Sequence, residues 1–193
     1  MRFLIDGHRD RVTSRMEQWP EGVIGQLLTP LTRYKLGHKV FGIDNGAFSG
    51  FNEREFRNLL RRNAAHSADA LFVAIPDRVG CHRTTAALYR DYSPLADGWR
   101  KAFVAQDGFD GAPECADAIF IGGTDSFKDS EEALELVRVT VAAGKHAHIG
   151  RVNGPERFLR FMRVGAHTCD GSGVSRYDHM ILAIKEAVQC SGS

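Results

Sequence analysis

The stretch His146–Ser172, HAHIGRVNGPERFLRFMRVGAHTCDGS, decides the fold. It begins with a short apolar run, His146–Ile149, continues into a helix-like segment that starts at Pro155, and ends in a second apolar run, His167–Cys169. Proline is well placed at the first position of a helix, and Gly165 stands where such a helix is expected to end. A strand, a helix and a strand in this order predict a parallel βαβ unit.

The same alternation extends over the rest of the chain. Further short runs, rich in β-branched or aromatic residues as parallel strands buried on both faces are, are Arg2–Ile5, Val23–Leu28, Val40–Ile43, Leu71–Ile75, Ala102–Ala105 and Ala118–Ile121. Segments with apolar residues at helical spacing are Glu53–Ala65, Arg83–Leu95, Ser130–Ala143, Pro155–Val164 and Asp178–Gln189. Eight candidate strands predict an α/β fold, a compact (β/α)8 TIM-like barrel in one domain, residues 1–193, with a doubly wound open sheet as the alternative.

The length and composition narrow this prediction. The chain has 193 residues, fewer than the roughly 250 usual for such a barrel, so we expect some crossovers to be loops, particularly between the first three strands. The net charge of +1 does not indicate a strongly basic nucleic-acid binder, although it leaves room for a local basic face. The sequence contains neither a signal-peptide core nor an apolar stretch of ~20 residues, which predicts a cytoplasmic protein without a membrane partner.

The cysteines and histidines do not form a recognisable ligand pattern. The four cysteines lack CxxC spacing, and the eight histidines lack HExxH spacing, so we expect neither a disulfide framework nor a metal site. His146 and His148 alternate on one predicted strand and therefore point to the same face, but the segment lacks the cysteine and carboxylate context of a metal site.

Polar residues follow the predicted strands at the edge where barrel enzymes carry their sites. Asp44, Asp77 and Asp170 each come directly after, or close to, the end of an apolar run. Other residues at the same edge are Gln106, Gly122, Gly123, Gly150 and Arg151. A single aspartate at a strand end often only caps the next helix, but so many polar groups at one rim favour a binding site.

This set of residues suits a planar heterocycle. Asp77 can accept two N–H groups, while Gln106 and a backbone N–H at Gly122 or Gly123 can meet a carbonyl group. Glycines allow the backbone to approach a ring closely, and Phe48 can stack on its face. Asp44 and Asp170 are then left for chemistry, and paired carboxylates are the usual means of cleaving a glycosidic bond.

These motifs resemble the tRNA-guanine transglycosylase superfamily. The likeness is greatest to its DNA-acting branch, the DpdA-type 7-deazaguanine transglycosylases of phages and bacterial genomic islands. The opening stretch resembles the family's block that ends in the nucleophilic aspartate, and DNGAFSGF (44–51) resembles its acid/base loop. The segments IPDRVG (75–80), FVAQDG (103–108) and FIGG (120–123) resemble its base-recognition strand ends.

The resemblance implies a role for each position. Asp170 attacks C1′, and Asp44 transfers protons to the leaving and incoming base. The base edge is bound by Asp77, Gln106, Gly122 and Gly123, with Phe48 on one face and Ile149 and Gly150 near the other. The expected activity is exchange of guanine in DNA for a free 7-deazaguanine base, such as 7-cyano-7-deazaguanine, with no cofactor or metal.

The zinc-binding insertion of the tRNA enzymes has no counterpart here, because only 23 residues follow Asp170 and one of them, Cys190, is a cysteine. This favours DNA as the partner, with phosphate contacts from Arg151. Further basic candidates, each of which also fits an ordinary solvated helix face, are Arg54, Arg57 and Arg157. Two alternatives remain open at this point. Water can replace the incoming base, giving a DNA glycosylase that excises a modified base, or the barrel can bind a nucleobase without turnover.

Overall fold

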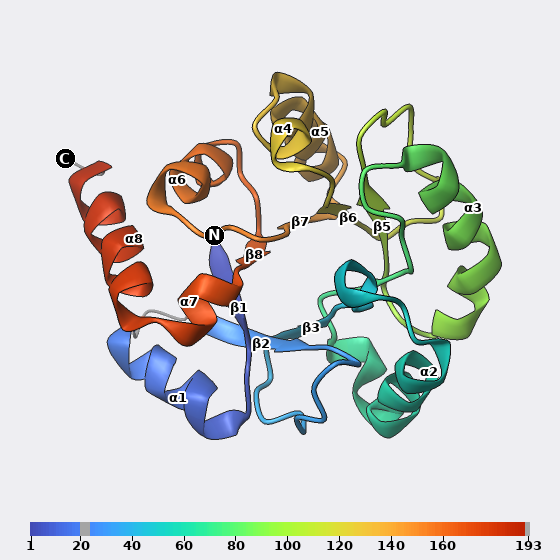
Figure 1. Cartoon of the computed structure of the whole chain (residues 1–193), viewed down its shortest axis with the longest axis horizontal. Helices are drawn as coiled ribbons and strands as arrows, with labels where there is room; N and C mark the ends of the chain where they lie inside the picture. Colours follow the sequence, from blue (N-terminus) through green and yellow to red (C-terminus); the bar gives the residue numbers. More distant parts are fainter. Residues whose placement is uncertain (20–23, 192–193) are drawn as a thin grey trace.

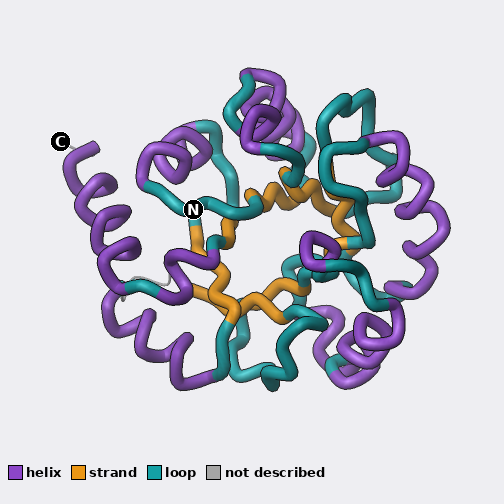
Figure 2. Tube along the Cα trace, viewed as in Figure 1, coloured by secondary structure: helices purple, strands orange, loops and turns teal. Residues whose placement is uncertain are grey.

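The protein is a closed barrel of eight parallel strands in the order β1 to β8, surrounded by helices (Figures 1 and 2). The computed structural model describes residues 1–19 and 24–191, so Val23 of the second predicted strand lies outside the described residues. The strands are β1 Arg2–Asp6, β2 Ile24–Leu28, β3 Phe41–Ile43, β4 Val73–Ala74, β5 Lys101–Ala105, β6 Ala118–Ile121, β7 His146–Ile149 and β8 Thr168–Asp170. Pairing of β1 with β8 closes the barrel and confirms the predicted fold over the open sheet.

Helices follow most strands on the outside of the barrel. They are α1 Arg9–Gln18, α2 Glu53–Arg62, α3 His82–Tyr92, α4 Asp125–Lys128, α5 Glu131–Ala142, α6 Pro155–Arg163, α7 Ser172–Arg176 and α8 Asp178–Ser191, with 3-10 turns η1 Ala47–Ser49, η2 Ala64–Asp69 and η3 Ser93–Ala96. Local sequence explains their ends. The Ser130 side chain accepts a hydrogen bond from Ala133 N at the start of α5, and Gly144 and Gly165 take positive φ just past α5 and α6.

The prediction of loops between the first three strands is half right. Residues 29–40 connect β2 to β3 without a helix, as does the connection from β5 to β6, but helix α1 lies between β1 and β2 (Figure 1). The sequence pattern missed α1 because it is mostly charged and exposed, with only Val12 and Arg15 buried. Apolar periodicity is therefore too weak there to indicate a helix.

The strands separate two apolar layers. One layer packs the outer face of the barrel against the helices and includes Phe3, Phe56 and Phe158. The other fills the barrel interior with residues that include Leu4, Phe72 and Phe120. Because successive residues of a strand point to opposite faces, β1, β2, β4, β5 and β6 contribute apolar residues to both layers. Within residues 1–19 and 24–191, no helix is long and apolar enough to cross a membrane.

Candidate active site

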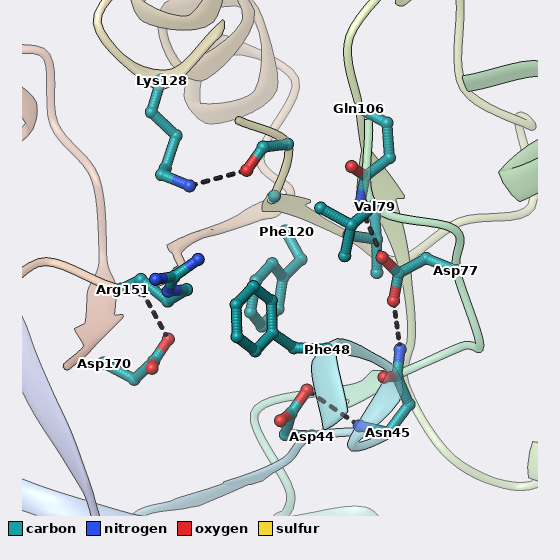
Figure 3. Close-up of a pocket in the computed structure, with 14 residues that line it drawn as sticks. Asp44, Asn45, Phe48, Asp77, Val79, Gln106, Phe120, Lys128, Arg151 and Asp170 are labelled. Carbon is teal, nitrogen blue, oxygen red and sulfur yellow. Dashed lines mark hydrogen bonds between the residues drawn. The ribbon is translucent and has the colours of Figure 1, made fainter. Parts of the chain in front are cut away.

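One cavity at the carboxyl ends of the strands gathers most of the predicted site (Figure 3). The residues that line it come from β5, β6 and the end of β8 and from the segments that follow β3, β4, β5, β6 and β7. They are Asp44, Asn45, Phe48, Asp77, Val79, Val104, Gln106, Phe120, Gly122, Gly123, Lys128, Gly150, Arg151 and Asp170. All three strand-end aspartates singled out in the sequence therefore meet at one place.

Asp44 follows β3 directly, and its main-chain N–H is fixed by the carbonyl of Leu28 at 2.8 Å. Its side chain is partly exposed and lines the cavity. Burial raises the pKa of Asp44 to about 7, and the charges of Asp170 and Asp77 add to this, although hydrogen bonds from the backbone of Asn45 and Gly46 oppose it. A carboxyl group with such a pKa can both donate and accept a proton near neutral pH.

Asp77 lies in a network that the sequence did not reveal. Its Oδ1 accepts a hydrogen bond from Asn45 Nδ2 at 2.8 Å, and its Oδ2 accepts one from Gln106 Nε2 at 2.6 Å. Gln106 Oε1 in turn accepts from the backbone N–H of Gly80 at 2.8 Å. Burial raises the pKa of Asp77 to about 6, against the opposing effect of the Asn45 bond. Gln106 therefore holds Asp77 in place and has little capacity left for a ligand.

Asn45 is a site residue that sequence reasoning passed over. It is buried, and besides Asp77 it donates to the carbonyl of Ile75 at 3.0 Å. Its own Oδ1 accepts from Ala47 N at 2.7 Å, which starts the 3-10 turn η1. Asn45 thus ties the loop after β3 to the loop after β4. An asparagine next to a strand-end aspartate was the only available signal, and it also fits a simple turn.

Asp170 is the last residue of β8 and is held on one side. Its Oδ1 accepts hydrogen bonds from His148 Nε2 at 3.1 Å and from the backbone N–H of Arg151 at 3.2 Å. The main chain is fixed as well, because Val152 N donates to the Asp170 carbonyl at 2.6 Å. Arg151 has a φ of 60°, an uncommon conformation for a residue other than glycine. Residues held in such conformations cluster at functional sites.

Phe48 and Arg151 lie together at the rim of the cavity. The Arg151 guanidinium carbon is 4.1 Å from the centre of the Phe48 ring, which is a cation–π contact, and the Phe48 side chain is 62% exposed. The cavity holds only about 80 Å³ in this arrangement. Small-molecule sites are typically ~300–1,000 Å³, so we expect Phe48 and Arg151 to separate when a ligand enters.

The predicted glycines are required by close packing. A Cβ atom on Gly122 would lie 2.7 Å from Gln106 Nε2, and one on Gly150 would lie 2.5 Å from Phe120 Cε1. Gly123 has a φ of 76°, and a Cβ there would lie 2.7 Å from Phe127. Gly122 and Gly150 therefore make room for Gln106 and Phe120, which line the cavity, and Gly123 makes room for the buried Phe127.

Lys128 is a second residue that the sequence did not indicate. It comes from α4, its side chain is only 1% exposed, and it reaches the cavity, where Nζ donates to the Gly123 carbonyl at 2.7 Å. Burial lowers the pKa of Lys128, against the opposing attraction of Asp125. A lysine on a helical segment ordinarily predicts a solvated side chain, so nothing in the sequence placed Lys128 in the cavity.

Two predicted contacts are not in the cavity. Ile149 was expected near the face of a bound base, but it is fully buried in the outer layer and does not line the cavity. The reason is strand alternation, which places His148 and Gly150 on the inner face and Ile149 on the outer one. Arg157 was expected at a phosphate, but its guanidinium pairs with Asp129 at 2.8 Å and Asp125 at 3.0 Å.

Arg54 and Arg57 lie on the surface of α2, away from the residues that line the cavity. Arg57 Nε donates to Glu53 at 2.7 Å, and Arg54 lies 3.4 Å from Glu55. Their contact with a nucleic-acid backbone stays a prediction. Over the described part of the chain, no group of three or more His, Cys, Asp or Glu residues is arranged to hold a metal ion.

Comparisons with known proteins identify the fold. No family model matches the chain, and no curated protein matches it. Among solved structures, one described as the native structure of KDPGal aldolase matches with a TM-score of 0.52 and 12% identity. The match covers 98% of this chain and 93% of the other. At this identity it shows a shared (β/α)8 barrel.

The prediction of DNA transglycosylation is wrong. The structural neighbour is an aldolase barrel, and this finding points away from exchange of guanine in DNA for a 7-deazaguanine. The same finding gives no support to the two alternatives, excision of a base from DNA and nucleobase binding without turnover. The KDPGal structure does not test whether the chain is related to the transglycosylase superfamily. That resemblance of the motifs therefore stays a prediction.

Proposed function

We propose that the barrel mouth is the active site of an enzyme that acts on a small polar substrate with a carboxylic acid, Asp44, and a carboxylate, Asp170. The observation that supports this is the raised pKa of Asp44, about 7, which results from burial and from the neighbouring charge of Asp170. Titratable neighbours whose environments differ in this way identify the acid and the base of many active sites.

The two aspartates have complementary tasks in this proposal. Asp44, with its pKa raised to about 7, is protonated in part of the molecules at neutral pH and donates this proton to the leaving group of the substrate. The Asp170 carboxylate, which accepts two N–H donors, faces the carbon that loses the leaving group, and a water molecule then adds to this carbon and returns a proton to Asp44. Such a pair serves reactions in which positive charge develops on a carbon while a bond to it breaks.

The cavity walls limit the substrate. Asp77 offers a fixed carboxylate, and the glycine main chain of residues 122, 123 and 150 allows close approach. The rings of Phe48 and Phe120 provide apolar surface on the lining. We infer that the substrate combines a flat, apolar portion with N–H or O–H donors for Asp77.

A second function is favoured by Lys128. Burial lowers the pKa of Lys128, which increases the share of free amine at a given pH, and a free amine condenses with a carbonyl group to give an imine and water. Lys128 lines the same cavity as Asp44 and Asp170, so an imine there has acid and base groups beside it. In this case the enzyme is an aldolase-like lyase of a carbonyl substrate.

One set of experiments separates the two functions. The purified protein is incubated with chromogenic small glycosides and, separately, with KDPGal in the presence of sodium borohydride, and products and protein mass are followed. The carboxylate mechanism predicts turnover that Asp170→Asn and Asp44→Asn abolish and that Lys128→Met retains. The imine mechanism predicts a covalent mass increase on Lys128 that Lys128→Met abolishes.

Asp107→Asn is the matched control for these substitutions. Asp107 also follows a strand end, but its carboxylate binds Thr124 N at 2.9 Å and Thr124 Oγ1 and does not line the cavity. Turnover equal to that of the wild type is expected. Turnover of a glycoside that survives unchanged in both Asp44→Asn and Asp170→Asn contradicts the carboxylate mechanism.

A further inference from the structure

A hydrogen-bonded chain extends from Asp170 into the interior of the barrel. His146 and His148 alternate on β7, and Thr168 and Asp170 alternate on β8, so all four side chains point to the inner face. The two strands are neighbours, and His148 pairs with Thr168 in the register of the sheet. The sequence predicted that the two histidines share a face, and the proposed reaction assigns no role to either of them.

The chain is continuous in the structure. His148 Nε2 lies 3.1 Å from Asp170 Oδ1, and His148 Nδ1 lies 2.8 Å from Thr168 Oγ1. The same Thr168 oxygen lies 2.8 Å from His146 Nε2. Both ring nitrogens of His148 therefore have a polar partner.

The surroundings of His148 are apolar. Its side chain is 0% exposed, and its ring centre is 4.6 Å from that of Phe72 and 4.4 Å from that of Phe120. Burial lowers the pKa of His148 despite the hydrogen bond and charge of Asp170, and burial lowers the pKa of His146 to about 3. An imidazolium between two phenyl rings is costly to bury, so both rings are neutral.

The number of protons on each group determines which atom donates and which accepts in each hydrogen bond from His146 to Asp170. A carboxylate oxygen such as Asp170 Oδ1 only accepts, so the proton of a neutral His148 must be on Nε2. Nδ1 is then bare and must accept the hydroxyl proton of Thr168. The Thr168 oxygen has no further proton to give, and it accepts the Nε2–H of His146.

We propose that His148 is a positioning residue, held as the Nε2–H tautomer by Thr168 and His146, which fixes the Asp170 carboxylate so that Oδ2 acts on the substrate. This rests on the proposed function only for the role of Asp170. The assignment of Oδ2 follows from the bonding, since His148 Nε2 and Arg151 N both donate to Oδ1. Within residues 1–19 and 24–191, no donor is recorded for Oδ2, which leaves it free to face the cavity.

The test reads the tautomer directly and needs no substrate. ¹⁵N NMR of the histidine rings is recorded between pH 5 and 8 on the full chain, with His148→Gln used to assign the His148 signals. The expected result is one protonated nitrogen, Nε2, and one bare, hydrogen-bonded nitrogen, Nδ1, at pH 7 and above. A proton on Nδ1, or protons on both nitrogens at pH 7, overturns the proposal.

Two variants of Thr168 test the direction of the chain. In Thr168→Val the Nδ1 signal is expected to move to the position of an unbonded nitrogen, while Nε2 stays protonated, and in Thr168→Ser both signals are expected to stay where they are. An Nδ1 signal that does not move in Thr168→Val overturns the proposal. Thr140→Val is the matched control, because Thr140 is equally buried but binds the Leu136 carbonyl on α5.

The outcomes keep the two proposals apart. If the tautomer is as expected but no substrate is turned over in an Asp170-dependent way, the proposed function fails and the positioning of Asp170 stands. If turnover depends on Asp170 while His148 is an imidazolium, the function stands and this inference fails.

Discussion

The barrel mouth has an aspartate on each of two sides, Asp170 at β8 and Asp44 after β3, and their surroundings differ. On the β8 side, Asp170 accepts hydrogen bonds from His148 and from the backbone of Arg151. On the β3 side, burial and neighbouring carboxyl groups raise the pKa of Asp44 to about 7, and only backbone N–H groups oppose them. The difference teaches that the environment, and not the residue type, raises the pKa of Asp44 and makes it suited to act as an acid.

The largest expected effect comes from the β8 side. Asp170→Asn is expected to lower kcat by roughly 10³-fold or more, because it removes the charge that stabilises the reacting carbon. The same variant should lower the pKa of Asp44 towards its usual value, since the charge of Asp170 helps to raise it. A carboxyl ¹³C titration of Asp44 measures this shift, and an unchanged pKa contradicts the coupling of the two sides.

Asp44→Asn should lower kcat by about 10²–10⁴-fold, the usual contribution of a general acid. The same substitution should increase the free energy of unfolding, although it lowers kcat. Folding raises the pKa of Asp44 from 3.8 to about 7, so the folded protein holds a proton that the unfolded chain releases. The free energy of unfolding of the wild type therefore falls as the pH rises from about 4 to 7.

Asparagine does not titrate, so Asp44→Asn should flatten this fall and should be more stable than the wild type by about 2–4 kcal/mol at pH 8. Urea unfolding at pH 4.5 and pH 8 measures it, with Asp107→Asn as the control. Equal pH dependence in the wild type and Asp44→Asn contradicts the raised pKa.

The close contact between Gly150 and Phe120 in the cavity lining should tolerate no added atom. In Gly150→Ala the new Cβ would lie 2.5 Å from Phe120 Cε1, and we expect a loss of about 1–3 kcal/mol from overpacking. Gly154→Ala is the control, because a Cβ there meets nothing within 4 Å. Thermal unfolding compares the two variants, and equal midpoints contradict the close packing of the wall.

The smallest effect is expected outside the mouth. Arg157→Gln removes ion pairs with the exposed residues Asp125 and Asp129, and exposed ion pairs contribute about 0–1 kcal/mol. We expect unfolding to change by no more than this amount and kcat to stay at the wild-type value. A tenfold loss of kcat in Arg157→Gln would give this arginine a role in the reaction.

The fold was predictable because the pattern of apolar residues within each short segment indicates a strand or a helix. Short apolar runs that alternate with amphipathic segments are dictated by burial, and each predicted run that the structure describes overlaps a strand. Helix α1 was missed because a charged, exposed helix lacks apolar periodicity. The placement of Asp44, Asp77 and Asp170 at one mouth follows from the rule that parallel strands end at the same edge.

The rest of the site depends on contacts between distant segments. Asn45 and Gln106 hold Asp77 from two different loops, and Lys128 is buried by the position of α4. No pattern along the chain encodes such pairings. The misplacement of Ile149 was avoidable, however, because the alternation of β7 that puts His148 inside puts Ile149 outside.

The central claim is that the pKa of Asp44 is raised to about 7 beside the Asp170 carboxylate, so that Asp44 can act as an acid. Its most direct test is ¹³C NMR of the Asp44 carboxyl carbon in the ligand-free wild type from pH 3 to 9, assigned with Asp44→Asn. The account predicts a titration midpoint near pH 7. A midpoint near 4, the usual value for an aspartate, would contradict it.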